Sequence, residues 1–220
     1  MSAKRRRTPR DARRRSLGQN FLVDRTEVNR LVDAIDVHPG ELIIEIGAGT
    51  GALTLPLLQA GASVMAIEKD PVWARQLHEK VREKGLLDHV EIVRRDFRVT
   101  EWQSETYRVV SNPAFGLTTA LFARLFDNPA VGPLRADLLI QYEVARKRAA
   151  TPPTTLRSAA WAPWWTFQLG PVIPRKAFRP VPRVDAALLV VRRRNPPVLP
   201  EWLAPQLREL LRPAWKPPSG

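Results

Sequence analysis

The hydrophobic pattern predicts seven β-strands, each a short apolar run bounded by turn-forming or charged residues. They lie at residues 42–46, 63–67, 90–93, 107–110, 138–142, 165–172 and 187–191. Apolar runs as short as these are typical of strands that are buried on both faces of a parallel sheet. The pattern therefore predicts a sheet that lies in the interior of the protein.

Between the strands, apolar residues recur with helical spacing. The first predicted helix is capped by Asp24 or Thr26 and ends near Ile35. Further helices are predicted at residues 52–60, 71–84, 118–126, 143–149 and 202–211. Strands that alternate with helices indicate an α/β fold with a doubly wound parallel sheet.

Length and composition favour one α/β domain with two short flanking segments. The 220 residues are 44% hydrophobic, which is enough for a sizeable core. We expect a basic, disordered arm at residues 1–15, a domain at 16–195 and a proline-rich extension with one candidate helix at 196–220. No apolar run reaches the roughly 18 residues that a membrane span needs, and no secretory signal is evident. We therefore expect a cytoplasmic protein.

Two features of the composition exclude some chemistry and favour a polyanionic partner. The chain has no cysteine, which excludes disulfides, thiol catalysis and cysteine-bound zinc, and we expect no metal site. The formal net charge is +13, and a large part of this excess lies in residues 1–15. A solubilising tail or an anionic membrane could also account for the arm, but no apolar face accompanies its charges. We expect phosphate contacts, most simply with a nucleic acid, from Arg5, Arg6, Arg7, Arg13, Arg14 and Arg15.

A glycine-rich turn follows the first predicted strand. The sequence Glu45-Ile46-Gly47-Ala48-Gly49-Thr50-Gly51 leads from the strand into a helical pattern, as in nucleotide-binding βαβ units. Its Gly-x-Gly-x-Gly spacing differs from the Gly-x-Gly-x-x-Gly of dinucleotide sites. The spacing favours a ligand without a pyrophosphate, such as S-adenosylmethionine (SAM). Glu68 ends the next strand, where a carboxylate can bind both hydroxyls of a ribose.

Four polar clusters follow strands whose carboxyl ends meet at one edge of the predicted sheet, where ligands bind in such folds. They are 45–51, Glu68, Asp96 and 112–115. In the last cluster, Asn112 and a nearby carbonyl can accept hydrogen bonds from one amino group, and Phe115 offers a flat face for a base. This set suits an exocyclic amine of adenine as the methyl acceptor, although Asn-Pro by itself is also a common loop sequence.

These motifs, taken together, resemble the ribosomal RNA adenine-N6 methyltransferases. The resemblance covers about residues 16–194 and is closest to the erythromycin-resistance (Erm) methyltransferases of 23S rRNA. Its motifs are 19–22, 45–54, 67–70, 95–96, 112–115 and 178–185. It implies a Rossmann-like, SAM-dependent methyltransferase fold with a seven-stranded, mostly parallel sheet whose last strand is antiparallel.

The resemblance also implies roles for individual residues. Cofactor-binding residues would be Gln19, Asn20, Leu22, Glu45, Gly47, Gly49, Glu68, Asp96 and Asn112. Asn112 and Phe115 would be catalytic, and Phe115 and Phe178 would stack on a flipped-out adenine. The partner would be 23S rRNA, free or in a pre-ribosomal particle, and the protein would be a monomer. The expected consequence is resistance to macrolides, lincosamides and streptogramin B.

Two departures from the family pattern leave alternatives open. The family usually has Asn-Ile-Pro-Tyr/Phe where this chain has Asn112-Pro113-Ala114-Phe115, and it usually carries a larger helical C-terminal domain. The alternatives are a small-subunit rRNA dimethyladenosine transferase, a DNA adenine methyltransferase and a non-catalytic nucleic-acid-binding factor. The missing domain argues against the first, residues 19–22 and 178–185 against the second, and the intact motif residues against the third.

Overall fold

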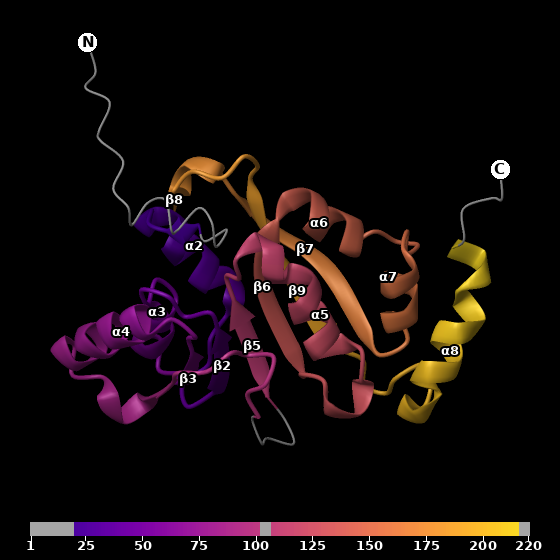
Figure 1. The fold of residues 1–220 in the computed structure, drawn as a ribbon, viewed down its shortest axis with the longest axis horizontal. Coiled ribbons are helices and arrows are strands. Elements are labelled where there is room, and N and C mark those ends of the chain that lie inside the picture. The colour runs from indigo at the N-terminus through magenta and orange to yellow at the C-terminus, as the bar shows by residue number, and fades with distance from the viewer. Residues whose placement is uncertain (1–19, 102–106, 216–220) are drawn as a thin grey trace, which may run out of the picture.

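A seven-stranded sheet runs through the middle of the protein in the computed structural model, which describes residues 20–101 and 107–215 (Figure 1). The strands are β2 (Leu42–Ile46), β3 (Ser63–Ile67), β4 (Val90–Val93), β5 (Arg108–Ser111), β6 (Arg135–Gln141), β7 (Trp165–Ile173) and β9 (Ala186–Arg193). They are hydrogen-bonded in the order β4-β3-β2-β5-β6-β9-β7. Only β9, the last strand of this sheet in the chain, runs antiparallel to its neighbours β6 and β7. The predicted sheet is thus confirmed.

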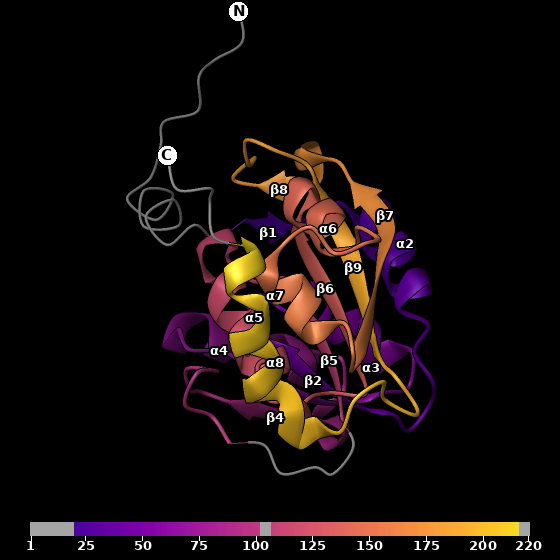
Figure 2. The ribbon, with the colours of Figure 1, turned by 90° about the vertical axis from the view of Figure 1, so that its right-hand side faces the viewer.

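Helices cover both faces of the sheet because successive residues of each strand point to opposite faces. One face packs against α2 (Arg25–Ile35), α3 (Thr54–Gln59) and α4 (Pro71–Glu83), with Ile43 among the strand residues buried there. The other packs against α5 (Thr118–Phe126), α6 (Tyr142–Arg148), α7 (Leu156–Trp161) and α8 (Ala204–Leu211), with Ile44 buried there. Figure 2 shows α5, α7 and α8 on one side of the strands and α2 and α3 on the other.

Two predicted helix starts are confirmed, those of α2 and α4. Asp24 caps α2, because its side chain accepts hydrogen bonds from the backbone N–H groups of Thr26 and Glu27. Pro71 occupies the first turn of α4, where its missing N–H costs least. The helix predicted from residue 52 begins only at Thr54, since a turn continues through Leu53.

Among the α-helices and strands that the structure describes, three escaped prediction. Two are the short strands β1 (Phe21–Leu22) and β8 (Phe178–Arg179), which pair antiparallel with each other. Two residues are too few to produce a periodic pattern, so only their pairing identifies them. The third is α7, whose start is marked by Thr155, since its side chain accepts a hydrogen bond from the N–H of Ser158.

The proline-rich segment after residue 195 packs against the same core as α7. Ala204 of α8 is buried, and the indole N–H of Trp164 donates to the carbonyl of Leu199 at 2.8 Å. The helix predicted at 202–211 is present as α8, and its first residues form a 3-10 turn. The division into a domain and an extension at residue 195 stays a prediction.

A buried ion-pair network fixes the end of α2 to the amino ends of β5 and β6. The Arg108 guanidinium donates to Asp137 at 2.9 and 3.0 Å, to Glu41 at 2.8 Å and to the carbonyl of Ile35. Arg135 donates to the other carboxylate oxygen of Asp137 at 2.9 Å. Because α2 follows β1 almost directly in the chain, this network also restrains the segment that carries β1.

Glu45 lies inside β2 with its carboxyl group buried. The Thr54 hydroxyl, at the start of α3, donates to Glu45 Oε2 at 2.5 Å, which joins the strand to the helix across the glycine-rich turn. Burial raises the pKa of Glu45 to about 8 against an ordinary value of 4.5, so this carboxyl group is largely protonated at neutral pH.

We predict that Glu45→Gln removes a loss of stability that the wild type shows as the pH rises from about 4.5 to about 8. In the wild type, the folded state keeps a proton that the unfolded state loses above pH 4.5, so this residue's contribution to stability declines between pH 4.5 and about 8. The decline is at most about 1.4 kcal/mol per pH unit. The substitution should remove this decline, because an amide does not titrate, as urea unfolding at pH 5, 6, 7 and 8 would measure.

The exposed Glu143→Gln provides the control for this series. Glu143 pairs with Arg146 at the surface, where ion pairs contribute little, so its replacement should leave the pH profile almost unchanged. Parallel profiles for the wild type and Glu45→Gln would contradict the protonated state inferred for Glu45.

Candidate functional site

A cavity of about 450 Å³ opens at the carboxyl edge of the sheet. Its wall is formed by β1, by the ends of β2 and β3, and by the segments that follow β4 and β5. Eight of the predicted cofactor-binding residues line it: Asn20, Leu22, Glu45, Gly47, Gly49, Glu68, Asp96 and Asn112. The ninth, Gln19, and the arginines of the predicted arm lie outside the described residues.

The glycine-rich turn takes a backbone conformation that residues with a side chain rarely adopt. Gly47, Gly49 and Gly51 have φ angles of 78°, 54° and 81°. A Cβ on Gly49 would lie 3.1 Å from the Phe21 ring, and one on Gly51 would lie 2.7 Å from Leu77. A Cβ on Gly47 would meet no protein atom within 4 Å, so the cavity wall is open beside this residue. The turn therefore leaves room for a ligand close to the backbone.

Glu68, at the end of β3, holds this turn with its carboxylate. One carboxylate oxygen accepts from the N–H of Gly49 at 2.8 Å, and the other accepts from the N–H of Asp70 at 2.7 Å. The side chain is only 6% exposed, and burial raises its pKa. Each oxygen retains a further lone pair, so the carboxylate can still accept hydrogen bonds from two neighbouring ribose hydroxyls.

Asp96 lies beyond the end of β4. In the sheet, β3 and β2 separate β4 from β5, which Asn112 follows, so Asp96 and Asn112 line opposite sides of the cavity. It accepts hydrogen bonds from Arg98 at 2.6 and 3.0 Å and from Lys69 at 2.9 Å. The hydrogen bonds from Arg98 are the main reason that its pKa lies well below the ordinary value. An ionised carboxylate can accept from the amino group of an adenine, which would have to share Asp96 with these two side chains.

Asn112 follows β5, whose end is attached to that of β2. The Ser111 hydroxyl donates to the carbonyl of Ile46 at 2.6 Å, which places Asn112 beside the glycine-rich turn. Asn112 is half-buried, and its amide nitrogen lies 3.5 Å from the carbonyl oxygen of Asn20, the outer limit of a hydrogen bond. Its side-chain oxygen has no contact of this kind with the described residues and is available as an acceptor.

Several cavity residues were not among the predicted site residues. The Phe21 ring covers Gly49 and contacts Trp73 of α4, with ring centroids 5.0 Å apart. Phe21 lies in the family motif at 19–22, so the sequence could have marked it as a site residue. Its contact with Trp73 could not be predicted, because it depends on the fold. Lys69 and Arg98 also line the cavity and flank predicted residues in the sequence.

Neither of the two predicted stacking residues lines the cavity. Phe115 is half-buried and packs against the core on the side of α2 and α3. Phe178 is 0% exposed, because β8 places it in that same core, and its backbone is paired with Leu22. A fully buried ring offers no face to a base. The stacking roles of both residues stay predictions, and this conformation does not support the one assigned to Phe178.

The described residues contain no group of three metal-binding side chains. Within these same ranges, no helix is both long and apolar enough to cross a membrane.

The cavity residues fit SAM. Gly47 leaves space beside the backbone, Glu68 can accept from ribose hydroxyls, and Asp96 can accept from an adenine amino group. A ligand held by these three residues would extend along the carboxyl edge from β4 towards β2, next to Asn112 of β5. The set therefore accommodates a nucleoside whose extension lies beside Asn112.

Comparison with known proteins identifies the family. Residues 10–214 match the family described as ribosomal RNA adenine dimethylase. The chain is 40% identical over 183 residues to an rRNA adenine N-6-methyltransferase of Corynebacterium diphtheriae, a match covering 83% of this chain and 70% of the relative. It is 37% identical over 216 residues to the mycinamicin-resistance protein MyrB of Micromonospora griseorubida, covering 96% of this chain and 66% of the relative. The chain thus spans about two thirds of the length of these relatives.

The fold agrees with these matches. The crystal structure of the 23S rRNA methyltransferase ErmE superposes with a TM-score of 0.76 at 28% identity, covering 88% of this chain and 78% of that chain. The sheet order, the cavity at its carboxyl edge and the family match over most of the sequence all lead to one assignment. The chain belongs to the ribosomal RNA adenine dimethylase family.

Proposed function

We propose that this protein transfers a methyl group from SAM to the exocyclic N6 amine of an adenine in 23S rRNA. The observation that carries the proposal is the single cavity in which Asn112 lies with Gly47, Glu68 and Asp96. The relatives named for rRNA adenine methylation, and the likeness to ErmE, support ribosomal RNA as the substrate.

Bound SAM would supply a methyl group on a positively charged sulfur atom. Glu68 would bind its ribose and Asp96 its adenine amino group, while the glycine-rich turn and Phe21 would enclose the bound nucleoside. Asn20 and Leu22 of the β1 segment, with the neutral carboxyl of Glu45 below the turn, complete the cofactor wall.

Asn112 would act on the methyl acceptor. The lone pair of an adenine amino nitrogen is delocalised into the ring, which makes it a poor nucleophile. Hydrogen bonds from its two N–H groups to the Asn112 side-chain oxygen and to a nearby carbonyl favour a pyramidal nitrogen with a localised lone pair. Pro113 offers no N–H that would compete for these acceptors. The amine loses its extra proton after transfer, so Asn112 need not be a base, and positioning provides most of the rate.

The target base has to leave its stack to reach this cavity. A paired adenine cannot present its amine to Asn112, because the amine takes part in base pairing. The substrate is therefore an unpaired or extruded adenine. Methylation of such an adenine in 23S rRNA would confer resistance to macrolides, lincosamides and streptogramin B, in keeping with the name of the relative MyrB.

The remaining parts of the proposal concern the protein's partners and location. The protein acts as a cytoplasmic monomer without a metal ion or a membrane partner. Arg5, Arg6, Arg7, Arg13, Arg14 and Arg15 of the arm bind RNA phosphates through a sequence-independent electrostatic interaction.

A labelling experiment tests the reaction and the substrate together. The protein is incubated with SAM labelled in its methyl group and with separated large- and small-subunit rRNA, and the modified base is mapped. We expect label on the N6 position of an adenine in 23S rRNA only. Label in small-subunit RNA would establish the alternative substrate, and no label in either RNA would overturn the enzymatic proposal.

Asn112→Ala should lower kcat by about 100-fold or more, because the acceptor for the reacting amine is lost. Affinity for S-adenosylhomocysteine, measured by calorimetry, should change little, since Glu68 and Asp96 remain. Asn29→Ala, at an exposed position on α2, is the matched control and should behave as the wild type. Wild-type turnover in Asn112→Ala would remove Asn112 from the mechanism.

Deleting residues 1–14 should weaken RNA binding and make it less dependent on salt, because fewer counterions are released. The deletion removes seven of the chain's basic residues, Lys4, Arg5, Arg6, Arg7, Arg10, Arg13 and Arg14. Filter binding at several salt concentrations measures the slope of log K against log salt. A slope equal to that of the full chain would show that the arm makes no phosphate contacts.

A further inference from the structure

The segment between β7 and β9, residues 174–185, is a loop with an excess of positive charge. We call it the basic loop. Its four cationic side chains, Arg175, Lys176, Arg179 and Arg183, are all exposed. Its one carboxylate, Asp185, accepts a hydrogen bond from the backbone N–H of Arg175 at 2.7 Å. Within the described ranges, none of the four cationic groups forms an ion pair. The loop therefore presents charge that the described part of the protein does not neutralise.

The backbone of the basic loop is held in place on the body of the protein. β8 pairs with β1, and the carbonyl of Ala177 accepts from the N–H groups of Val23 and Asp24 at 2.9 and 3.3 Å. The ring of Phe178 is fully buried beneath the loop. A charged loop that is already ordered pays little conformational entropy when it binds a partner.

The basic loop lies beside the cavity. Arg179 is directly opposite Phe21 in the β1–β8 pair, and Phe21 lines the cavity wall. Neighbouring strands are about 4.8 Å apart, so Arg179 is one strand away from the site. Its guanidinium donates to the carbonyls of Lys176 and Phe178 at 2.9 and 2.8 Å, which keeps it against the loop.

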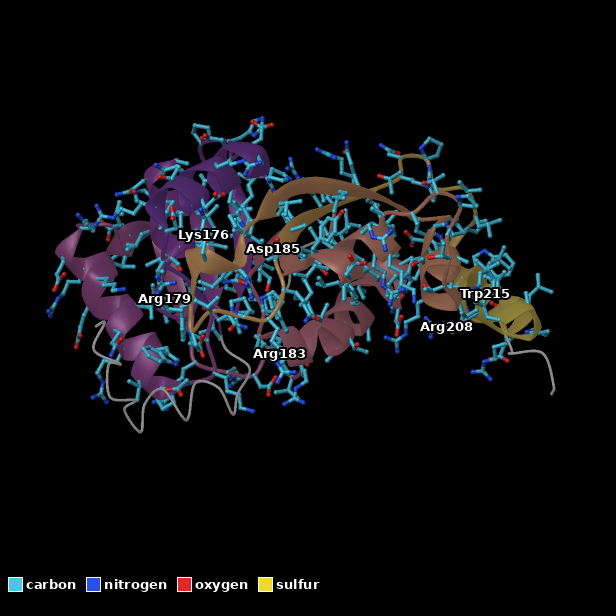
Figure 3. The ribbon with its side chains drawn as sticks, turned by 90° about the horizontal axis from the view of Figure 1, so that it is seen from above. Lys176, Arg179, Arg183, Asp185, Arg208 and Trp215 are labelled. Atoms are coloured by element: carbon cyan, nitrogen blue, oxygen red, sulfur yellow. The ribbon has the colours of Figure 1, made fainter. Side chains whose placement is uncertain are left out.

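Figure 3 shows Lys176, Arg179 and Arg183 around this one loop, whereas Arg208 lies at the other end of the molecule. Two cationic side chains that line the cavity, Lys69 and Arg98, are neutralised by ion pairs with Asp96, unlike the cationic side chains of the basic loop. The basic loop therefore adds positive charge next to the cavity without occupying its carboxylates.

We propose that the basic loop binds the phosphates of the RNA strand next to the nucleotide whose base enters the cavity. This inference rests on the function proposed above, and it assigns Lys176, Arg179 and Arg183 as positioning residues for the substrate. The loop has no exposed aromatic ring, because its only one, Phe178, is buried. Its contacts are therefore to the sugar–phosphate backbone, which sets the position of the strand without reading its sequence.

The variant Lys176→Ala/Arg183→Ala tests this inference. Neither side chain forms a hydrogen bond with the described residues, so the fold should be retained, and the melting temperature checks this. Arg179 is left in place because its guanidinium supports the loop. The full chain is measured with a 23S rRNA fragment that contains the mapped target adenine.

We expect the RNA dissociation constant to rise by about tenfold at moderate salt. The slope of log K against log salt should fall by roughly 1.4, which corresponds to two lost contacts with a single strand. The KM for RNA should rise while kcat at saturating RNA stays close to that of the wild type. Affinity for S-adenosylhomocysteine should be unchanged, since neither residue lines the cavity.

Arg82→Ala/Lys84→Ala provides the matched control. These two residues lie at the C-terminal end of α4 and are exposed, and their replacement removes the same charge. Because α4 runs from the carboxyl edge towards the amino edge of the sheet, they lie at the opposite end of this helix from Pro71, and neither lines the cavity. Equal changes in both variants would show that only net charge matters, and this would overturn the proposal.

The outcomes separate this inference from the proposed function. If the wild-type protein methylates no RNA, the proposed function fails, and this inference fails with it. If the wild type methylates RNA and the loop variant keeps the wild-type KM and salt slope, only the inference fails. Loss of binding to an acidic protein, with RNA binding intact, would assign the loop to a protein partner and would also overturn it.

Discussion

The site depends first on the carboxylate of Glu68. It accepts from the backbone N–H of Gly49 on one side and from that of Asp70 on the other, and so joins the glycine-rich turn to the start of α4. Burial of this group is unfavourable, as its raised pKa shows, and the two N–H donors offset part of that cost. This bridge sets the spacing between the turn and α4 together with the hydrogen bond that Lys80 of α4 donates to the carbonyl of Thr50 at 2.7 Å.

Two further contacts bring the acceptor side of the reaction to this cavity. The Ser111 hydroxyl joins the ends of β5 and β2, which places Asn112 beside the turn. The β1–β8 pair joins the cofactor wall at Phe21 to the basic loop at Arg179. In the proposed function, chemistry and substrate positioning belong to different segments: the cavity would select and activate an amine, while the basic loop and the arm would act on the RNA backbone.

Much of the fold and of the site could be predicted because the signals are local. The strands are apolar runs, Asp24 and Pro71 mark helix starts, and the glycine spacing marks the turn. In a parallel sheet the carboxyl ends of the strands meet at one edge, so residues that follow different strands converge there. For this reason Glu68, Asp96 and Asn112 line one cavity, as predicted from their positions in the sequence and from the family resemblance.

By itself, the sequence determined which segments form the strands, the edge of the sheet at which the site lies and the residue types available there. Only the tertiary structure decided which side chains are accessible: Phe178 is an aromatic residue in a motif, yet it is buried, and Phe21 covers the turn instead. It also decided which charges are neutralised, since Arg108 is enclosed by Asp137 and Glu41 whereas Lys176 and Arg183 remain at the surface. The physical reason is that burial and ion pairing depend on partners from distant parts of the chain, which periodicity and spacing do not encode.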